Sequence, residues 1–188
     1  MSANQAVMHF HRPGPLLALV GNPNCGKSAL FNLLTGSRQK VANYAGVTVE
    51  RVEGECLTHS GKRLRVLDLP GAYSLSAHSP EEVIARDFIL EQRPDAAIVV
   101  ADATNLERNL YLAAQVLELG APVTLALNMM DRAEAEGIAI DVELLARLLG
   151  VPVVPTVGTR RQGLMDLVGL AVTEAASHPN LIDYGIEL

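Results

Sequence analysis

The chain has 188 residues, of which 49% are hydrophobic and 19% charged, and its formal net charge is −6. A chain of this size suits one domain, which buries roughly 70% of the surface that its unfolded form exposes. The acidic balance argues against a nucleic-acid partner, since phosphate backbones are bound by basic surfaces. The two cysteines, Cys25 and Cys56, are too few for a disulfide framework and suit a reducing compartment. No apolar run approaches the roughly 18 residues of a membrane span, so we expect the chain as it stands to be soluble and cytosolic.

Residues 1–14 lack the apolar core of a signal peptide, and we expect them to form a flexible lead-in. The first strong pattern follows at 21–28, where GNPNCGKS matches the phosphate-binding loop G-x-x-x-x-G-K-[ST]. The apolar stretch at 16–20 predicts a buried strand before this loop, and the apolar residues at 29–34 predict a helix after it. Strand, glycine-rich turn and helix is the context that such a loop requires.

In a loop of this kind the backbone N–H groups surround a phosphate, and the positive end of the next helix faces it. Lys27 is expected to reach the β- and γ-phosphates, and the Ser28 hydroxyl to bind Mg²⁺. The residues expected to contact a nucleotide here are Asn22, Pro23, Asn24, Cys25, Gly26, Lys27, Ser28 and Ala29.

Two strands are predicted next. Residues 37–47 are polar, and we expect them to form a long loop. Thr48 opens an alternating run to Val52, and a turn at 60–61 leads to an apolar run at 64–67. We expect these two strands to pair as an antiparallel hairpin.

A helix is predicted from Ser79 to about Gln92. Ser79 would be its N-cap, Pro80 its first residue, and Glu82 would complete a capping box. Capping explains the two glutamates at 81 and 82 more simply than a catalytic or metal-binding role.

Strands and helices alternate in the rest of the chain. Strands are predicted at 95–101, 122–127 and 151–157, and helices at 106–119, 141–149 and 164–176. This alternation predicts an α/β domain of three layers, with a mostly parallel sheet of six to seven strands and helices on both faces. Together with the phosphate-binding loop, it indicates a P-loop NTPase.

Ligands of such sheets bind beyond the carboxyl ends of the strands, where Asp68-Leu69-Pro70-Gly71 is expected. Asp68 could hold Mg²⁺ through water, and the Gly71 N–H could sense the γ-phosphate, with Leu69 and Pro70 beside them. Ala72 stands where many small GTPases place the glutamine that orients the attacking water. We therefore expect slow intrinsic hydrolysis.

A third motif, Asn128-Met129-Met130-Asp131, resembles the Asn-Lys-x-Asp sequence that recognises guanine. The Asp131 carboxylate can accept from the ring N–H and the exocyclic amine of guanine, a donor pair that adenine lacks. Met129 replaces the usual lysine and would cover the base with its aliphatic chain, next to Asn128. A base-facing loop is expected at Gly158-Thr159-Arg160, where the usual pattern is Ser-Ala-Lys. Three motifs in this order predict a domain that binds guanine nucleotides.

The stretches at 21–50, 68–82, 102–112 and 128–131 resemble the G domain of the ferrous iron transport protein B (FeoB) family, a bacterial Fe(II) uptake system. The likeness covers about residues 15–175. It implies a Ras-like G domain on the cytosolic side of the inner membrane, whose Mg²⁺-dependent GTP hydrolysis regulates or drives Fe(II) uptake. It also implies two nucleotide-responsive switches, at about 36–48 and 70–80.

Within the first switch the resemblance implies nucleotide contacts from Gly46 and Val47 and a Mg²⁺ ligand in Thr48. Asn24 is similar to the asparagine that helps to bind K⁺ in potassium-activated GTPases, with backbone carbonyls of Ala42 and Tyr44 completing the coordination. That cation would replace the charge of an arginine finger. The alternative is that Asn24 only shapes the loop. The catalytic residues implied are Asn24, Lys27, Thr48 and Gly71.

Members of the family continue into a helical domain and a membrane region. We therefore expect a G domain at 15–177 and a linker toward those regions at 178–188. The expected partners are GTP or GDP, those absent regions, small Feo accessory proteins and a second copy in a homo-oligomer, but no nucleic acid. His59, His78 and His178 lack metal-ligand spacing, so iron binding does not follow from this chain.

Two other functions stay open. Several RNA- or ribosome-associated assembly GTPases share the G-x-P-N-x-G-K-S loop, although the acidic balance of this chain speaks against that role. A nucleotide-dependent interaction switch with negligible hydrolysis is the second, and Ala72 keeps it open.

Overall fold

The structure is a computed structural model, which describes residues 14–36, 39–44 and 47–177. Its strands are β1 (Leu16–Gly21), β2 (Gln39–Asn43), β3 (Glu50–Leu57), β4 (Arg63–Asp68), β5 (Ala96–Asp102), β6 (Val123–Asn128) and β7 (Val153–Pro155). Its helices are α1 (Lys27–Thr35), α2 (Pro80–Asp87), η1 (Phe88–Gln92), η2 (Ala103–Asn105), α3 (Leu106–Glu118), α4 (Met130–Ala135), α5 (Val142–Leu149) and α6 (Leu164–Ser177). None of these helices is long and apolar enough to cross a membrane.

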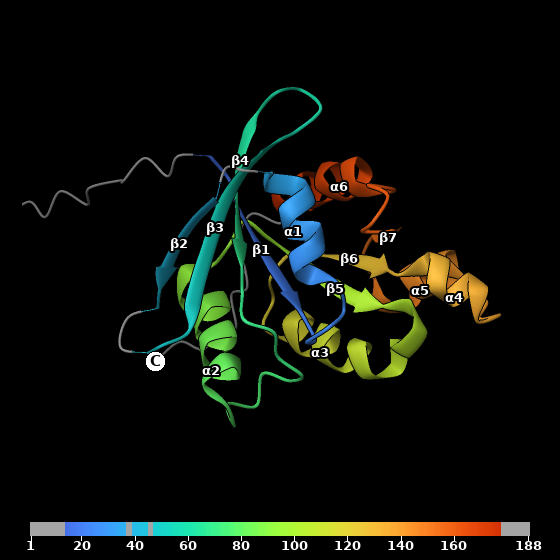
Figure 1. Ribbon diagram of the computed structural model, residues 1–188, viewed down its shortest axis with the longest axis horizontal. Coiled ribbons are helices and arrows are strands. Elements are labelled where there is room, and N and C mark those ends of the chain that lie inside the picture. Colours follow the sequence, from blue (N-terminus) through green and yellow to red (C-terminus); the bar gives the residue numbers. More distant parts are fainter. Residues whose placement is uncertain (1–13, 37–38, 45–46, 178–188) are drawn as a thin grey trace, which may run out of the picture.

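The strands form one seven-stranded sheet in the order β2-β3-β4-β1-β5-β6-β7. The first two pairs, β2–β3 and β3–β4, are antiparallel, and the pairs from β4 to β7 are parallel. Helices lie on both faces of the sheet (Figure 1). The expected three-layer, mostly parallel α/β fold is therefore confirmed.

Alternating side chains of β1 divide the core into two halves. Leu16, Ala18 and Val20 belong to one cluster, which includes buried side chains of η1 and α3. Leu17 and Leu19 belong to the other, which includes side chains of α1 and α6. All six residues of β1 are buried, as expected for a central strand covered on both faces. This rigid strand carries the phosphate-binding loop at its end.

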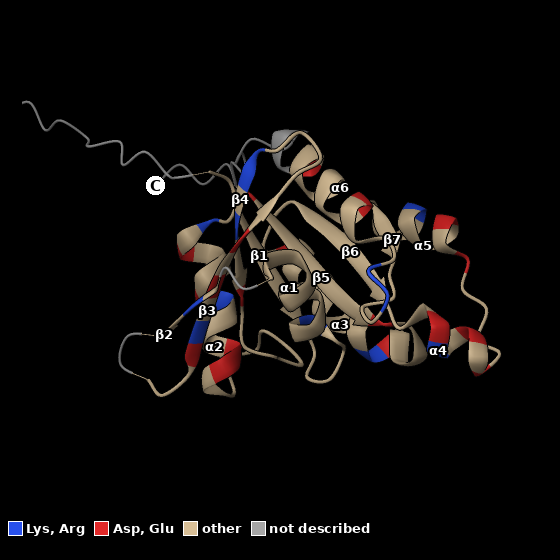
Figure 2. Ribbon diagram, turned by 45° about the horizontal axis from the view of Figure 1, so that its top comes forward, with Lys and Arg blue, Asp and Glu red and all other residues tan. Residues whose placement is uncertain are grey.

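The strands next to the antiparallel edge are held by charged side chains as well as by their ladder. Glu53 of β3 accepts hydrogen bonds from Arg65 of β4 at 2.6 Å and from Arg51 at 3.3 Å. Figure 2 shows both signs of charge along these two strands. The Arg65 hydrogen bond holds the pKa of the Glu53 carboxyl below its ordinary value.

The prediction of a loop at 37–47 is wrong for residues 39–43, which form the strand β2. The side chains of Lys40, Val41, Ala42 and Asn43 are exposed, so the segment has no apolar alternation to mark it as a strand. Its extended form comes from pairing with β3, where Val41 lies opposite Val52. The helix α4 was not predicted either, and β7 is shorter than the predicted strand.

The predicted cap of α2 is confirmed, and Glu82 makes further hydrogen bonds to the residues before the helix. The Ser79 hydroxyl accepts from the Glu82 N–H at 3.2 Å, and Pro80 opens the helix. Glu82 accepts from the His78 N–H at 3.0 Å and the Ser74 hydroxyl at 2.8 Å, and the backbone N–H of Ser79 also stabilises its carboxylate. The Ser74 bond, more than the others, lowers the pKa of Glu82. Both bonds fasten the preceding loop to α2.

Candidate nucleotide-binding site

The motifs found in the sequence meet at one edge of the sheet. Gly21 of β1 lies opposite Val100 of β5, and Leu19 of β1 lies opposite Asp68 of β4. At the far end of β5, Asp102 lies opposite Asn128 of β6. Because these strands are parallel, their carboxyl ends and the loops that follow share this edge (Figure 1).

The phosphate-binding loop turns sharply between β1 and α1. Asn24 and Gly26 have left-handed backbones, with φ of 66° and 86°, and the Cys25 N–H donates to the Asn22 carbonyl at 3.3 Å. Left-handed residues in such a turn direct backbone N–H groups into one concavity, which suits an anion. Gly26 has a second constraint, since a Cβ there would overlap the side-chain amide of Asn128.

Lys27, the first residue of α1, forms an ion pair with Asp68 at the end of β4. Both side chains are largely buried, with exposed fractions of 9% and 12%. Each buried charge stabilises the other, because a buried charge without a partner pays the free-energy cost of desolvation with no compensating interaction. Ser28, the next residue, is exposed. The phosphate-binding and Asp68 motifs are thus in contact, as the sequence predicts.

Asn128 joins the phosphate-binding loop to the last loop of the site. Its side-chain N–H donates to the Cys25 carbonyl at 2.9 Å. Its side-chain oxygen accepts from the Gly158 N–H at 3.1 Å and from the Thr156 hydroxyl at 3.2 Å. The side chain is buried and every one of these bonds crosses between segments far apart in the chain. Thr156 was missed, and its position just after a strand is the signal that could have revealed it.

Met129 lies at the same junction, with a left-handed backbone (φ 62°). Its methyl group comes within 3.4 Å of where a Cβ on Gly26 would stand. The side chain therefore lies against the phosphate-binding loop, and its role in covering the base stays a prediction.

Asp131 is partly exposed and forms no hydrogen bond or ion pair with any residue that the structure describes. It lines an open cavity of about 600 Å³ together with Val157 and Arg160. The cavity extends over α4 and the segment that follows it, and the phosphate-binding loop is not among its walls. A carboxylate left without a protein partner beside the Asn128 network is free to bind a ligand.

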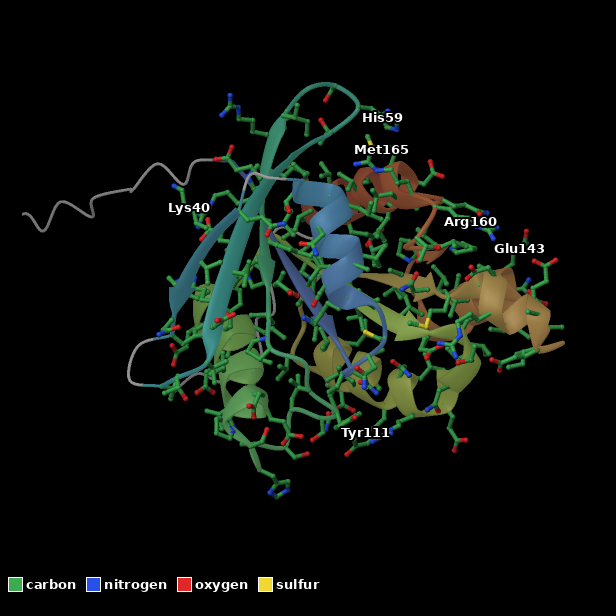
Figure 3. The ribbon with its side chains drawn as sticks, in the orientation of Figure 1. Lys40, His59, Tyr111, Glu143, Arg160 and Met165 are labelled. Atoms are coloured by element: carbon green, nitrogen blue, oxygen red, sulfur yellow. The ribbon has the colours of Figure 1, made fainter. Side chains whose placement is uncertain are left out.

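Only the first residue of the base-facing loop predicted at 158–160 contacts Asn128. Gly158 contacts Asn128, whereas Thr159 and Arg160 are exposed. Figure 3 shows Arg160 projecting outward beside α6. Nothing among the described contacts tests a role for Thr159 in binding.

The loop after Asp68 packs against the phosphate-binding loop. The Leu69 N–H donates to the Leu19 carbonyl at 3.0 Å, and the Ala72 N–H donates to the Gly21 carbonyl at 3.2 Å. A Cβ on Gly71 would lie 3.4 Å from atoms of Pro23. The segment that includes Pro70 and Gly71 is therefore beside the phosphate-binding loop, as its predicted role requires.

The first switch is less completely described. Ala42, Val47 and Thr48 are exposed, and Gly46 lies outside the described residues. Tyr44 packs against the main core cluster, but its buried hydroxyl has no hydrogen-bond partner among the described residues, and burial raises its pKa to about 12. The Mg²⁺ role of Thr48 and the K⁺ roles of Asn24, Ala42 and Tyr44 stay predictions.

Among the described residues, neither the cysteines nor the histidines offer a second centre. Burial raises the pKa of both thiols, Cys25 and Cys56, to about 11, so neither is a reactive thiolate at neutral pH. His59 and His78 are exposed, and His178 lies outside the described residues. Within the described part of the chain no three His, Cys, Asp or Glu side chains gather as a metal site.

Three loops lie at the carboxyl edge of a sheet that is covered on both faces: the phosphate-binding loop, the Asp-x-x-Gly loop and the Asn-x-x-Asp loop. This arrangement defines a P-loop nucleotide-binding protein of the G-domain type. The family model described as ferrous iron transport protein B matches residues 16–171. The chain belongs to the ferrous iron transport protein B family.

Curated relatives agree with this assignment. The chain is 50% identical over 152 residues to an Fe(2+) transport protein A/Fe(2+) transporter FeoB fusion protein of Porphyromonas gingivalis, a match that covers 80% of this chain and 18% of that protein. It is 50% identical over 169 residues to the Fe(2+) transporter FeoB of Salmonella typhimurium, covering 88% and 22%. The chain thus spans about a fifth of the length of these relatives.

Solved structures match most of the chain. The G domain of the T. maritima FeoB iron transporter is 44% identical, with a TM-score of 0.79 and coverage of 86% of this chain and 98% of that one. An S. thermophilus NFeoB mutant bound to mGDP is 51% identical, with a TM-score of 0.80 and coverage of 84% and 60%. Both support the G-domain fold.

Proposed function

We propose that this chain is a GTP-binding and GTP-hydrolysing domain that regulates or drives Fe(II) uptake by a membrane transporter. The observation that carries the proposal is the junction at Asn128. One buried side chain joins the phosphate-binding loop to the 156–158 loop, and the unpartnered carboxylate of Asp131 stands three residues further on. Two groups placed in this way can recognise the edge of a guanine base.

Mg²⁺ suits the groups near Lys27. A serine hydroxyl and a carboxylate are oxygen ligands of the kind that Mg²⁺ prefers, and Ser28 and Asp68 supply them. The Lys27–Asp68 pair keeps both charges paired when no phosphate is present. A bound triphosphate would attract Lys27 and leave Asp68 for the ion. Mg²⁺ in such a site neutralises charge on the β- and γ-phosphates.

The relatives support the wider proposal. S. thermophilus NFeoB structures contain GDP or mGDP, and the curated relatives are Fe(2+) transporters. One of them is fused to Fe(2+) transport protein A, which favours a small accessory protein as a partner. The proposed location is the cytosolic face of the inner membrane, with residues 15–177 as the G domain and 178–188 leading toward the helical and membrane regions.

Guanine recognition is tested by Asp131→Asn, which replaces one carboxylate oxygen of the side chain with an NH₂ group. In Asp131→Asn the two charge-assisted bonds to guanine are lost or replaced by a repulsive donor pair. At about 1.5–3 kcal/mol per bond, the affinity for GDP should fall roughly 100-fold or more, and isothermal titration calorimetry measures it.

The matched control is Glu134→Gln, which makes the same chemical change one helical turn away in the wall of the same cavity. It should leave GDP affinity within about twofold. Wild-type protein that binds ADP as tightly as GDP would contradict the proposal.

We also propose that K⁺ assists hydrolysis beside Asn24. Ala72 has no side chain that could orient water, and Asn24 is exposed in the phosphate-binding loop. The left-handed backbone of Asn24 supports the loop-shaping alternative equally, since asparagine adopts this conformation readily. Asn24→Gly separates the two, because glycine keeps the backbone shape and removes the amide.

The expected result is GTP turnover that is faster in KCl than in NaCl for wild-type protein and insensitive to the salt in Asn24→Gly. Equal rates in KCl and NaCl for the wild-type protein would exclude K⁺ activation. A salt effect that persists in the glycine variant would assign the side chain to loop shaping alone.

Filter binding and single-turnover hydrolysis decide between the remaining alternatives. An RNA- or ribosome-associated GTPase would retain rRNA or tRNA on a filter. Among the described residues, Lys and Arg are spread over several helices and strands (Figure 2). An interaction switch would show no product in single-turnover hydrolysis. We expect neither result.

A further inference from the structure

The loop between Gly71 and α2 is held to one face of α3 at two points. The Arg108 guanidinium carbon lies 4.0 Å from the centre of the Tyr73 ring, within the range of a cation–π contact. The side-chain oxygen of Gln115 accepts from the Leu75 N–H at 2.8 Å. Both contacts come from side chains of α3 to residues within five positions of Gly71.

Arg108 and Gln115 are two helical turns apart and therefore lie on the same face of α3. The helix beneath them is firmly packed, with Leu112 and Val116 fully buried. Hence the two side chains project from a helix that is anchored in the core, in the same cluster as Leu75 of the loop.

Arg108 also contacts the phosphate-binding loop. Its carbonyl accepts from the side-chain N–H of Asn22 at 3.4 Å, and Gly21, the preceding residue, accepts from the Ala72 N–H. Phosphate-binding loop, α3 and the Gly71–Leu75 loop are thus joined in a closed ring of contacts. Gly71, which is expected to contact the γ-phosphate, is part of this ring.

We propose that Arg108 and Gln115 are positioning residues that hold the Gly71–Leu75 loop for hydrolysis. This inference rests on the proposed GTPase function. With alanine at position 72, backbone groups of this loop must help to place the water and the γ-phosphate. Their position is set by the contacts of Tyr73 and Leu75 with α3. GDP lacks the γ-phosphate, so its binding does not depend on these contacts.

The experiment compares kcat for GTP with the Kd for GDP. Arg108→Ala should lower kcat about twofold to fivefold, in the range of an exposed cation–π contact. Gln115→Leu, which removes the acceptor at similar volume, should lower it by a similar or larger factor, and the double variant further. The Kd for GDP should stay within about twofold in all three. The ratio of affinities for a non-hydrolysable GTP analogue and GDP should fall.

Conservative variants provide the rescue. Tyr73→Phe keeps the ring under Arg108, and Gln115→Glu keeps an oxygen for the Leu75 N–H, so both should retain wild-type kcat. The matched control is Arg147→Ala, at an exposed arginine of α5. It should not change kcat.

Unchanged kcat in Arg108→Ala and Gln115→Leu would overturn the inference, as would a parallel loss of GDP affinity, which indicates a merely structural role. A wild-type chain that hydrolyses no GTP would overturn the proposed function instead. In that case the ratio of analogue to GDP affinity still tests whether α3 positions the loop.

Discussion

The loop after β4 and the edge strand β2 are supported in different ways. Leu69, Ala72 and Leu75, in the loop after β4, are buried, and that loop bonds to β1, α2 and α3. On the other side, β2 contributes only an edge of the sheet, and Val41 in it is 65% exposed. Figure 3 shows Lys40 pointing away from the sheet at this edge.

This difference predicts which substitutions should change stability and which should change function alone. Side chains that join separate elements on the buried side contribute to both stability and function. Side chains on the β2 edge cost little to remove, so any effect of changing them should appear in function alone. Tyr44 is the exception, since it belongs to the edge but packs in the core.

Among single substitutions, the largest effect should come from Asn128→Ala, at the centre of the buried side. The change removes three hydrogen bonds, worth about 1 kcal/mol each, so the free energy of unfolding should fall by about 3 kcal/mol. For a chain of this size that lowers Tm by about 6–12 °C, measurable by circular dichroism. Thr156→Val removes one of the three bonds and should cost about a third as much; equal losses would show that the bonds do not act separately.

Alkaline pH should weaken the buried side next. The folded pKa of Cys25 and Cys56 is raised from 9.0 to about 11, so above pH 9 the unfolded chain loses protons that the folded chain keeps. The stability is complete below pH 9 and falls between pH 9 and 11, by up to about 1.4 kcal/mol per pH unit for each thiol. Urea unfolding as a function of pH measures this slope. Cys56→Ala should make it shallower, and an unchanged slope in that variant would exclude Cys56 as a cause.

A smaller and opposite effect is expected at Tyr44, where the edge meets the core. Its buried hydroxyl has no partner in the part of the chain that the structure describes, and removing an unsatisfied buried hydroxyl stabilises the fold. Tyr44→Phe should therefore raise the free energy of unfolding by about 1 kcal/mol. Tyr44→Leu, which also removes the ring, should lower it. A loss of stability in the phenylalanine variant would reveal a partner for the hydroxyl.

The smallest effect should come from Val41→Ala on β2. An exposed edge side chain contributes little to folding, so the free energy of unfolding should change by less than about 0.5 kcal/mol. Val66→Ala, at a fully buried position of β4, is the matched comparison and should cost about 2–3 kcal/mol through lost burial and a cavity. Similar costs at the two positions would contradict the distinction between edge and core.

Much of this protein follows from local pattern. The phosphate-binding loop, the Asp68 and Asn128 motifs, the α2 cap and the alternating order of strands and helices all depend on residues close together in the chain. Short-range rules of backbone geometry and apolar period therefore predict them. The parallel sheet then places the motifs at one edge without further information.

Other features depend on contacts between distant segments. The β2 strand has no apolar period and exists because β3 supplies its hydrogen bonds. Thr156 and Gly158 became part of the site because Asn128, about 30 residues earlier, presents an oxygen to them. Arg108 and Gln115 gained their contacts because α3 packs beside the loop after Gly71. Local sequence determined which groups can bind a nucleotide, and only tertiary packing decided which other residues hold those groups in place, because hydrogen bonds and ring contacts depend on distance in space and not on distance along the chain.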